Sequence, residues 1–80
     1  MNGVKTDALN KLEKELHKEL AKPRKVEDTP SVVNPYVEKI HDIFRHYKYD
    51  VQCVYNGLYE GFIFVAWYDD DKVHTKIINI

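Results

Sequence analysis

Residues 49–67 read YDVQCVYNGLYEGFIFVAW, and this stretch decides the fold. Apolar and polar side chains alternate over residues 49–53 before Asn56-Gly57, and a short apolar run over residues 62–67 follows it. A period of two is typical of half-buried strands, and Asn-Gly between two such runs is a strong signal of a type I′ hairpin turn. The sequence therefore predicts strands over 49–55 and 58–67. A turn over 68–71 and a third strand over 72–80 complete an antiparallel meander.

The segment before the hairpin predicts two amphipathic helices. Leucines at positions 9, 12, 16 and 20 are spaced three or four residues apart, which predicts a helix over 7–22. Thr6 or Asp7 is suited to cap this helix, and Pro23 ends it. A second helix is expected over 34–47, because Asn34-Pro35 is a typical helix start. Residues 23–33 contain two prolines and mixed charge, so they are predicted to form an extended linker.

These elements predict one α+β domain over residues 1–80, with the order ααβββ and helix 2 packed on one sheet face. A chain of 80 residues with 44% apolar and 31% charged side chains has the balance of one small globular domain. The single cysteine, Cys53, excludes an internal disulfide framework. Together with the absence of an apolar leader and of any apolar run long enough to span a bilayer, it favours a cytoplasmic protein without a membrane partner.

The predicted turns fix the register of the strands, and the register assigns each side chain to a face. A two-residue turn at Asn56-Gly57 pairs Tyr55 with Leu58, and a turn at Asp69-Asp70 pairs Ala66 with Val73. The expected core face, covered by helix 2, then carries Tyr49, Val51, Cys53, Tyr55, Leu58, Phe62, Phe64, Ala66, Val73 and Ile77. The expected outer face carries Asp50, Gln52, Val54, Tyr59, Gly61, Ile63, Val65, Trp67, Lys72, His74, Lys76 and Ile78. Because this outer face is also rich in apolar side chains, helix 1, a second copy or a partner is expected to cover it.

No motif in the sequence predicts catalysis, a metal site or a cofactor. Cys53 has no histidine near it in sequence, and adjacent residues such as His74 and Thr75 point to opposite faces of a strand. The histidines lack ligand spacing, and the run of aspartates over 69–71 lacks the alternating ligands and the glycine of a calcium loop. We therefore expect a protein that is not an enzyme. The competing enzyme hypothesis is a metal-dependent nuclease or hydrolase that uses this aspartate run and His74.

The charge distribution favours a binding function. Residues 49–71 hold five acidic side chains and no lysine or arginine, although the net charge of the whole chain is only −1. Acidic rims steer basic partners, and Tyr and Trp supply contact area at low entropic cost. The sequence therefore predicts a protein-interaction module, in the form of a small inhibitor or nucleic-acid mimic of the kind common among phage accessory proteins. Its partner is expected to be a protein with a basic surface. The predicted binding residues are Tyr59, Trp67, Tyr68, Asp69, Asp70 and Asp71.

Two further partners remain open. The alternative function is a nucleic-acid-binding domain that uses Lys72 and Lys76 of the outer face with the basic segment Lys22-Pro23-Arg24-Lys25. It is the weaker hypothesis, because the chain lacks a net basic footprint. A homodimer through helix 1 is also expected, since a narrow leucine stripe suits pairing with its own copy.

Overall fold

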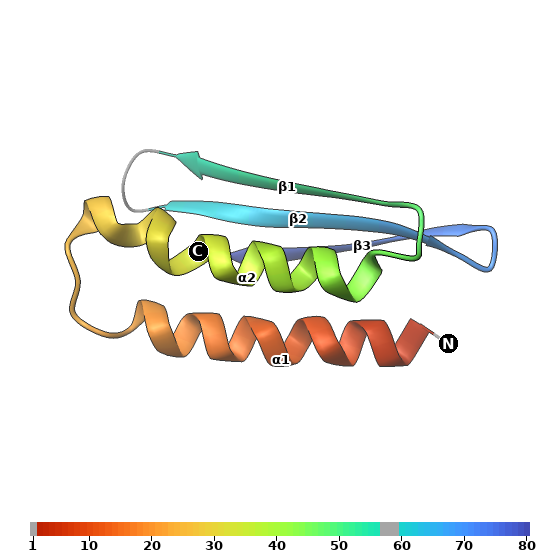
Figure 1. The fold of residues 1–80 in the computed structure, drawn as a ribbon, viewed down its shortest axis with the longest axis horizontal. Coiled ribbons are helices and arrows are strands. Elements are labelled where there is room, and N and C mark those ends of the chain that lie inside the picture. The colour runs from red at the N-terminus through yellow and green to blue at the C-terminus, as the bar shows by residue number, and fades with distance from the viewer. Residues whose placement is uncertain (1, 57–59) are drawn as a thin grey trace.

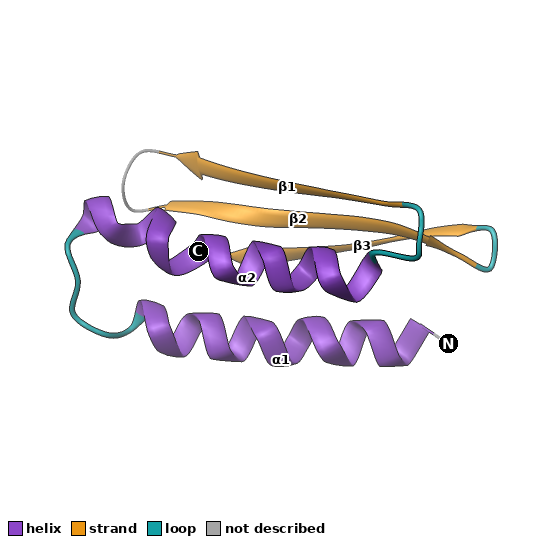
Figure 2. Cartoon of the chain, viewed as in Figure 1, coloured by secondary structure: helices purple, strands orange, loops and turns teal. Residues whose placement is uncertain are grey.

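The computed structural model describes residues 2–56 and 60–80 and shows helices lying along a three-stranded sheet (Figure 1). The helices are α1 (Asn2–Leu20), a short 3-10 helix η1 (Val26–Asp28) and α2 (Thr29–Phe44). The strands are β1 (Tyr49–Asn56), β2 (Glu60–Asp69) and β3 (Lys72–Asn79). They form one antiparallel sheet in the order β1-β2-β3 (Figure 2). The predicted α+β fold with the order ααβββ is confirmed.

Helix α1 begins earlier than its sequence predicts. It starts at Asn2, so Thr6 and Asp7 lie inside the helix and do not cap it. Its end agrees closely with the prediction, because Ala21 still donates to the His17 carbonyl and Pro23 follows two residues later. Leu9 and Leu16 are fully buried and Leu12 and Leu20 are half-buried, as the leucine spacing predicts.

Helix α2 also begins earlier, at Thr29, and it ends at Phe44. The prediction of an extended linker over 23–33 is therefore wrong from η1 onward. Pro30 occupies the first turn of α2, where its missing N–H costs no helical bond. Thr29 and Val33 are buried, so the longer helix covers apolar surface that a linker would leave in water. Pro35, predicted as the helix start, lies inside the helix.

The pairing of β1 with β2 differs from the predicted register, and the difference exchanges the two faces of β1. Val51 pairs with Val65 and Cys53 pairs with Ile63, whereas the predicted turn would pair Val51 with Phe62. The ladder closes at Asn56 and Glu60, so residues 57–59 connect the strands. The predicted type I′ turn at Asn56-Gly57 falls partly on these residues and lies outside the described part of the chain. Because the shift is an odd number of residues, the odd-numbered side chains of β1 lie beside the odd-numbered side chains of β2, and not beside Phe62 and Phe64 as predicted.

The β2–β3 turn is centred on Asp70 and Asp71, one residue later than predicted. Asp69 pairs with Lys72, and Ile63 pairs with Ile78. This register differs from the predicted one by an even step, so β2 and β3 keep the same grouping of faces.

The core lies between the helices and the face of the sheet that was expected to be the outer one. Helix α2 packs on Tyr49, Val51 and Cys53 of β1 and on the odd-numbered side chains of β2, and not on Phe62 and Phe64 as predicted. The Phe44 ring lies 4.9 Å from the Trp67 ring, measured between centroids. The buried apolar side chains are Leu9, Leu16, Val33, Ile40, Phe44, Ile63, Val65, Trp67 and Ile78.

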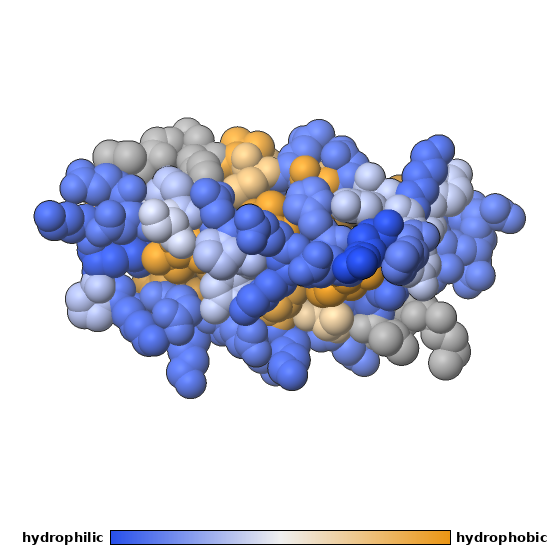
Figure 3. All heavy atoms as spheres, in the orientation of Figure 1, coloured by the Kyte–Doolittle hydropathy of each residue, from blue (hydrophilic) through white to orange (hydrophobic). Residues whose placement is uncertain are grey.

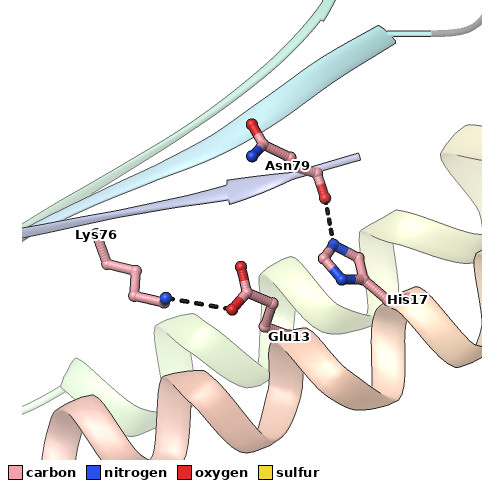
Figure 4. A network of polar contacts seen from close by, with 4 residues as sticks. All are labelled: Glu13, His17, Lys76 and Asn79. Atoms are coloured by element: carbon pink, nitrogen blue, oxygen red, sulfur yellow. Dashed lines mark hydrogen bonds and ion pairs between the residues drawn. The ribbon is translucent and has the colours of Figure 1, made fainter.

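Helix α1 lies in the same layer as α2 and contacts β3 through polar side chains (Figure 4). Lys76 Nζ lies 3.2 Å from Glu13 Oε1, and the His17 Nε2–H donates to the Asn79 carbonyl at 2.7 Å. Both helices therefore cover one side of the sheet. The leucine stripe that suggested pairing between copies is buried within its own chain.

Candidate functional site

The opposite side of the sheet carries apolar side chains that remain exposed to solvent. Alternation along the strands places on this side the even-numbered residues of β1 and β2 and the odd-numbered residues of β3. We call its apolar part the open sheet face, which consists of Val54, Phe62, Phe64, Ala66, Tyr68, Val73 and Ile77. Five of these side chains are 37–58% exposed. Contiguous exposed apolar surface on a small domain is typical of a binding surface.

The open sheet face contains a hollow near its Ala66 end. The hollow has a volume of about 180 Å³ and is lined by Lys48, Tyr49, Asp50, Ala66, Trp67, Tyr68 and Val73. Ala66 contributes only a methyl group between larger neighbours, and Asp50 is its partner on β1. The hollow is therefore mainly apolar, with the Asp50 carboxylate and the Lys48 ammonium group among its lining groups.

The face ends at an acidic turn that projects beyond both helices (Figure 1). Asp70 and Asp71 are exposed, and their φ angles of 53° and 61° place both in the left-handed region. Two consecutive positive φ angles are the signature of a type I′ turn, in which Asn and Gly are favoured and Asp is tolerated. We call Tyr68, Asp69, Asp70, Asp71 and Val73 the acidic hairpin end.

Two lysines moderate the charge of this end. Lys48 Nζ lies 5.6 Å from the centroid of the Tyr68 ring, and Lys72 is the register partner of Asp69. With Asp50 at the rim of the hollow, four carboxylates stand against two ammonium groups. The hairpin end is therefore acidic, while the open sheet face beside it is largely uncharged.

Of the predicted binding residues, Tyr68, Asp69, Asp70 and Asp71 are brought together at this end. Trp67 is not, because it is only 3% exposed and stacks on His74 at a centroid distance of 5.7 Å on the covered side. Its expected place on an outer, solvent-facing surface is wrong, since the helices cover that side. Within the described residues the Trp67 Nε1 atom is buried and has no hydrogen-bond partner. Tyr59 lies outside the described part of the chain.

Sequence reasoning missed the contribution of the residues on the open sheet face. Phe62, Phe64 and Ile77 were assigned to the core, and Ala66 and Val73 with them. The available signal was that both faces of β2 are apolar, so one of the two had to remain without a helix. The sequence alone did not tell which one.

The basic residues of the alternative hypothesis do not form a surface on the open side. Lys76 lies on the covered side and pairs with Glu13, while Lys22 pairs with Glu19 at 2.9 Å. Arg24 donates from Nε to Thr29 Oγ1 at 3.3 Å and from a terminal nitrogen to the Leu20 carbonyl. These contacts tie the basic segment to the helix ends.

The helical side of the molecule is mostly polar (Figure 3). A second hollow of about 300 Å³ lies between the helices and is lined by Ala8, Lys11, Leu12, Glu15, Lys39 and Ile43. Elsewhere on α2, burial and then the carboxylates of Glu19 and Glu15 raise the pKa of Tyr36. Tyr36 is remote in sequence from the hairpin end and titrates far above neutral pH, so this shift adds no chemistry there.

The described residues contain no group of three His, Cys, Asp or Glu side chains that could hold a metal ion. No helix in the described ranges is long and apolar enough to cross a membrane. No protein-family model, curated protein or solved structure matches the chain. The open sheet face and the acidic hairpin end are therefore the features from which a function can be inferred.

Proposed function

We propose that this protein is a non-enzymatic, cytoplasmic protein-interaction module that binds a basic protein surface through the acidic hairpin end. An inhibitor of a larger protein is the specific form that we favour. The observation that carries the proposal is the exposed Asp70-Asp71 pair in left-handed backbone at the tip of a projecting hairpin.

The backbone at this turn makes the choice of residues informative. Glycine adopts positive φ without cost, and asparagine tolerates it as well as aspartate does. Neither would place adjacent like charges at the tip, where mutual repulsion opposes folding. A locally unfavourable arrangement at an exposed position supports a role in binding.

The hairpin end combines charge with apolar contact area. Tyr68 is 44% exposed and Val73 is 58% exposed, and the two are register partners on the open side. The carboxylates would steer a basic partner and raise the association rate, while Tyr68 and Val73 would contribute contact area that slows dissociation. Tyr68 thus takes the anchoring role that the sequence assigned to Trp67.

The test compares the wild type with an Asp70→Asn/Asp71→Asn variant in affinity capture from a nuclease-treated lysate. Asparagine keeps the left-handed backbone and the size of the side chain while removing both charges. We expect a basic protein to be captured by the wild type. Its apparent affinity for the variant should be lower by roughly tenfold, and added salt should weaken its binding to the wild type more than its binding to the variant.

The matched control is Asp7→Asn/Asp42→Asn, which removes two exposed carboxylates from the helices. Because these lie away from the hairpin end, the control should capture the partner as well as the wild type does. Equal loss in both variants, or no loss in either, would contradict the proposed site. The same capture is repeated from a lysate without nuclease treatment. Recovery of nucleic acid alone from that lysate would favour the nucleic-acid alternative.

A further inference from the structure

The middle of the open sheet face is apolar and lies outside the acidic hairpin end, so the proposed function does not account for it. We call Val54, Phe62, Phe64, Ala66 and Ile77 the central patch. Phe62 is 37% exposed and Ile77 is 55% exposed, and the described helices lie on the other side of the sheet. In this patch the side chains are uncharged, so charge steering does not select what covers it.

We propose that a second copy of this chain covers the central patch, with the two sheets packed face to face and their β2 strands antiparallel. The two-fold axis would pass beside Phe64 and run across the strands in the interface plane. A closed, isologous contact of this kind uses the same patch on both subunits. Helix α1 takes no part, because its leucine stripe is already buried in its own chain.

This symmetry brings a large side chain onto a small one. Phe62 and Ala66 each lie two residues from Phe64 on β2, so the axis places Phe62 over Ala66 of the partner subunit. Ala66 is one of the residues that line the hollow of about 180 Å³, with Lys48, Asp50, Tyr68 and Val73 among the others. The Phe62 ring of each copy would therefore enter the hollow of the other, and the contact is formed twice.

The residues that lie beside Phe62 and Ala66 on β1 and β3 are compatible with the same arrangement. Phe62 shares its row with Val54 and Asn79, and Ala66 shares its row with Asp50 and Thr75. Under the two-fold axis Thr75 faces Asn79 of the partner subunit, which can hydrogen-bond to it. The two Asp50 carboxylates lie at opposite ends of the interface and do not repel each other closely.

The size of the whole sheet face on the open side, with the central patch in its middle, predicts a weak dimer. Three strands spaced about 4.8 Å apart and eight residues at about 3.3 Å each give a footprint of roughly 400 Å² per copy. Even with side-chain relief, the total buried area lies near the lower limit of about 1,000 Å² for specific interfaces. We therefore expect a dissociation constant in the micromolar range, on the order of 10–100 µM.

The dimer goes beyond the proposed function and does not depend on it. The acidic turns would lie at opposite ends of the assembly, outside the interface. Each dimer would thus present two Asp70-Asp71 turns to basic partners, while Tyr68 and Val73 lie at the edge of the interface. Purified protein without any partner tests the dimer, so its failure and the failure of the proposed function are distinguishable.

The experiment is sedimentation equilibrium over a concentration range of roughly 5–500 µM, which brackets the expected dissociation constant. The wild type should shift from monomer to dimer across this range. Phe62→Ala removes the large side chain and Ala66→Phe fills the hollow, so each should weaken the dimer by about tenfold or more. The double variant Phe62→Ala/Ala66→Phe exchanges the two partners and should restore the dimer toward wild-type strength.

Two controls define the result. Tyr47→Ala truncates an aromatic residue that is 39% exposed away from the open sheet face, and it should leave dimerisation unchanged. Asp70→Asn/Asp71→Asn should also dimerise as the wild type does. A wild type that stays monomeric over the whole range overturns the proposal without reference to any variant. A double variant as weak as the single variants would overturn the proposed antiparallel pairing.

Discussion

At the residue scale, Trp67 and Phe64 separate the covered side of the sheet from the open side. Both are large aromatic residues of β2, yet their side chains lie on opposite faces because they are an odd number of residues apart. Trp67 contacts Phe44 and is 3% exposed, whereas Phe64 is only half-buried. Their truncation should therefore have different consequences for stability.

We expect Trp67→Ala to lower the free energy of unfolding by about 3–5 kcal/mol, as truncation of buried aromatic residues does. Phe64→Ala should cost less, about 1–2 kcal/mol, because the ring is only partly buried and its removal leaves no closed cavity. Urea denaturation measures both, at low micromolar concentration, where the proposed dimer is dissociated. A larger loss for Phe64→Ala than for Trp67→Ala would show that the faces are assigned the wrong way round.

At the scale of elements, α2 contains a proline in its interior, where proline normally destabilises a helix. Pro35 lies inside the helix and is exposed, so its missing N–H leaves the Ser31 carbonyl without its usual helical donor. Pro35→Ala should restore that bond and raise the free energy of unfolding by about 1–3 kcal/mol. The matched control, Pro30→Ala, changes the first turn of the same helix, where proline costs no bond, and should give no gain. Thermal and urea unfolding of both variants check this, and a loss of stability in Pro35→Ala would contradict it.

The same elements show how far the sequence predicts the fold. Periodicity predicted the type and order of the helices and strands, because a repeat of two or of three to four residues is a local property. It did not predict the start of α2, since the advantage of burying Val33 depends on surfaces that are distant in the chain. Nor did it predict the β1–β2 register. The register expected from a turn at Asn56-Gly57 differs from the observed one by an odd number of residues.

The candidate site could be predicted only in part for the same reason. The acidic turn is a local feature, so Tyr68 and the three aspartates were found from the sequence. Choosing the open face required knowing which side the helices cover. The polar residues His74 and Lys76 on β3 suggested that their side of the sheet faces solvent. The helices cover that side, and there His74 stacks on Trp67 and Lys76 pairs with Glu13.

At the scale of the whole molecule, both helices cover one side of a three-stranded sheet, and apolar side chains on the other side are exposed. The acidic hairpin end gives this open side its charge, and the central patch gives it apolar area. Both proposals depend on this single assignment of a covered and an open side. If the assignment were reversed, Phe62 and Phe64 would be core residues and Trp67 would face the solvent.

Acrylamide quenching of Trp67 fluorescence tests the assignment most directly, because Trp67 is the only tryptophan in the chain. The measurement uses the Phe62→Ala variant at low micromolar concentration, so that a second copy cannot shield the ring. Since Trp67 is 3% exposed beneath Phe44, we predict a blue-shifted emission and a quenching constant several-fold below that of the urea-unfolded chain. Quenching in the folded protein as efficient as in the unfolded chain would contradict the account.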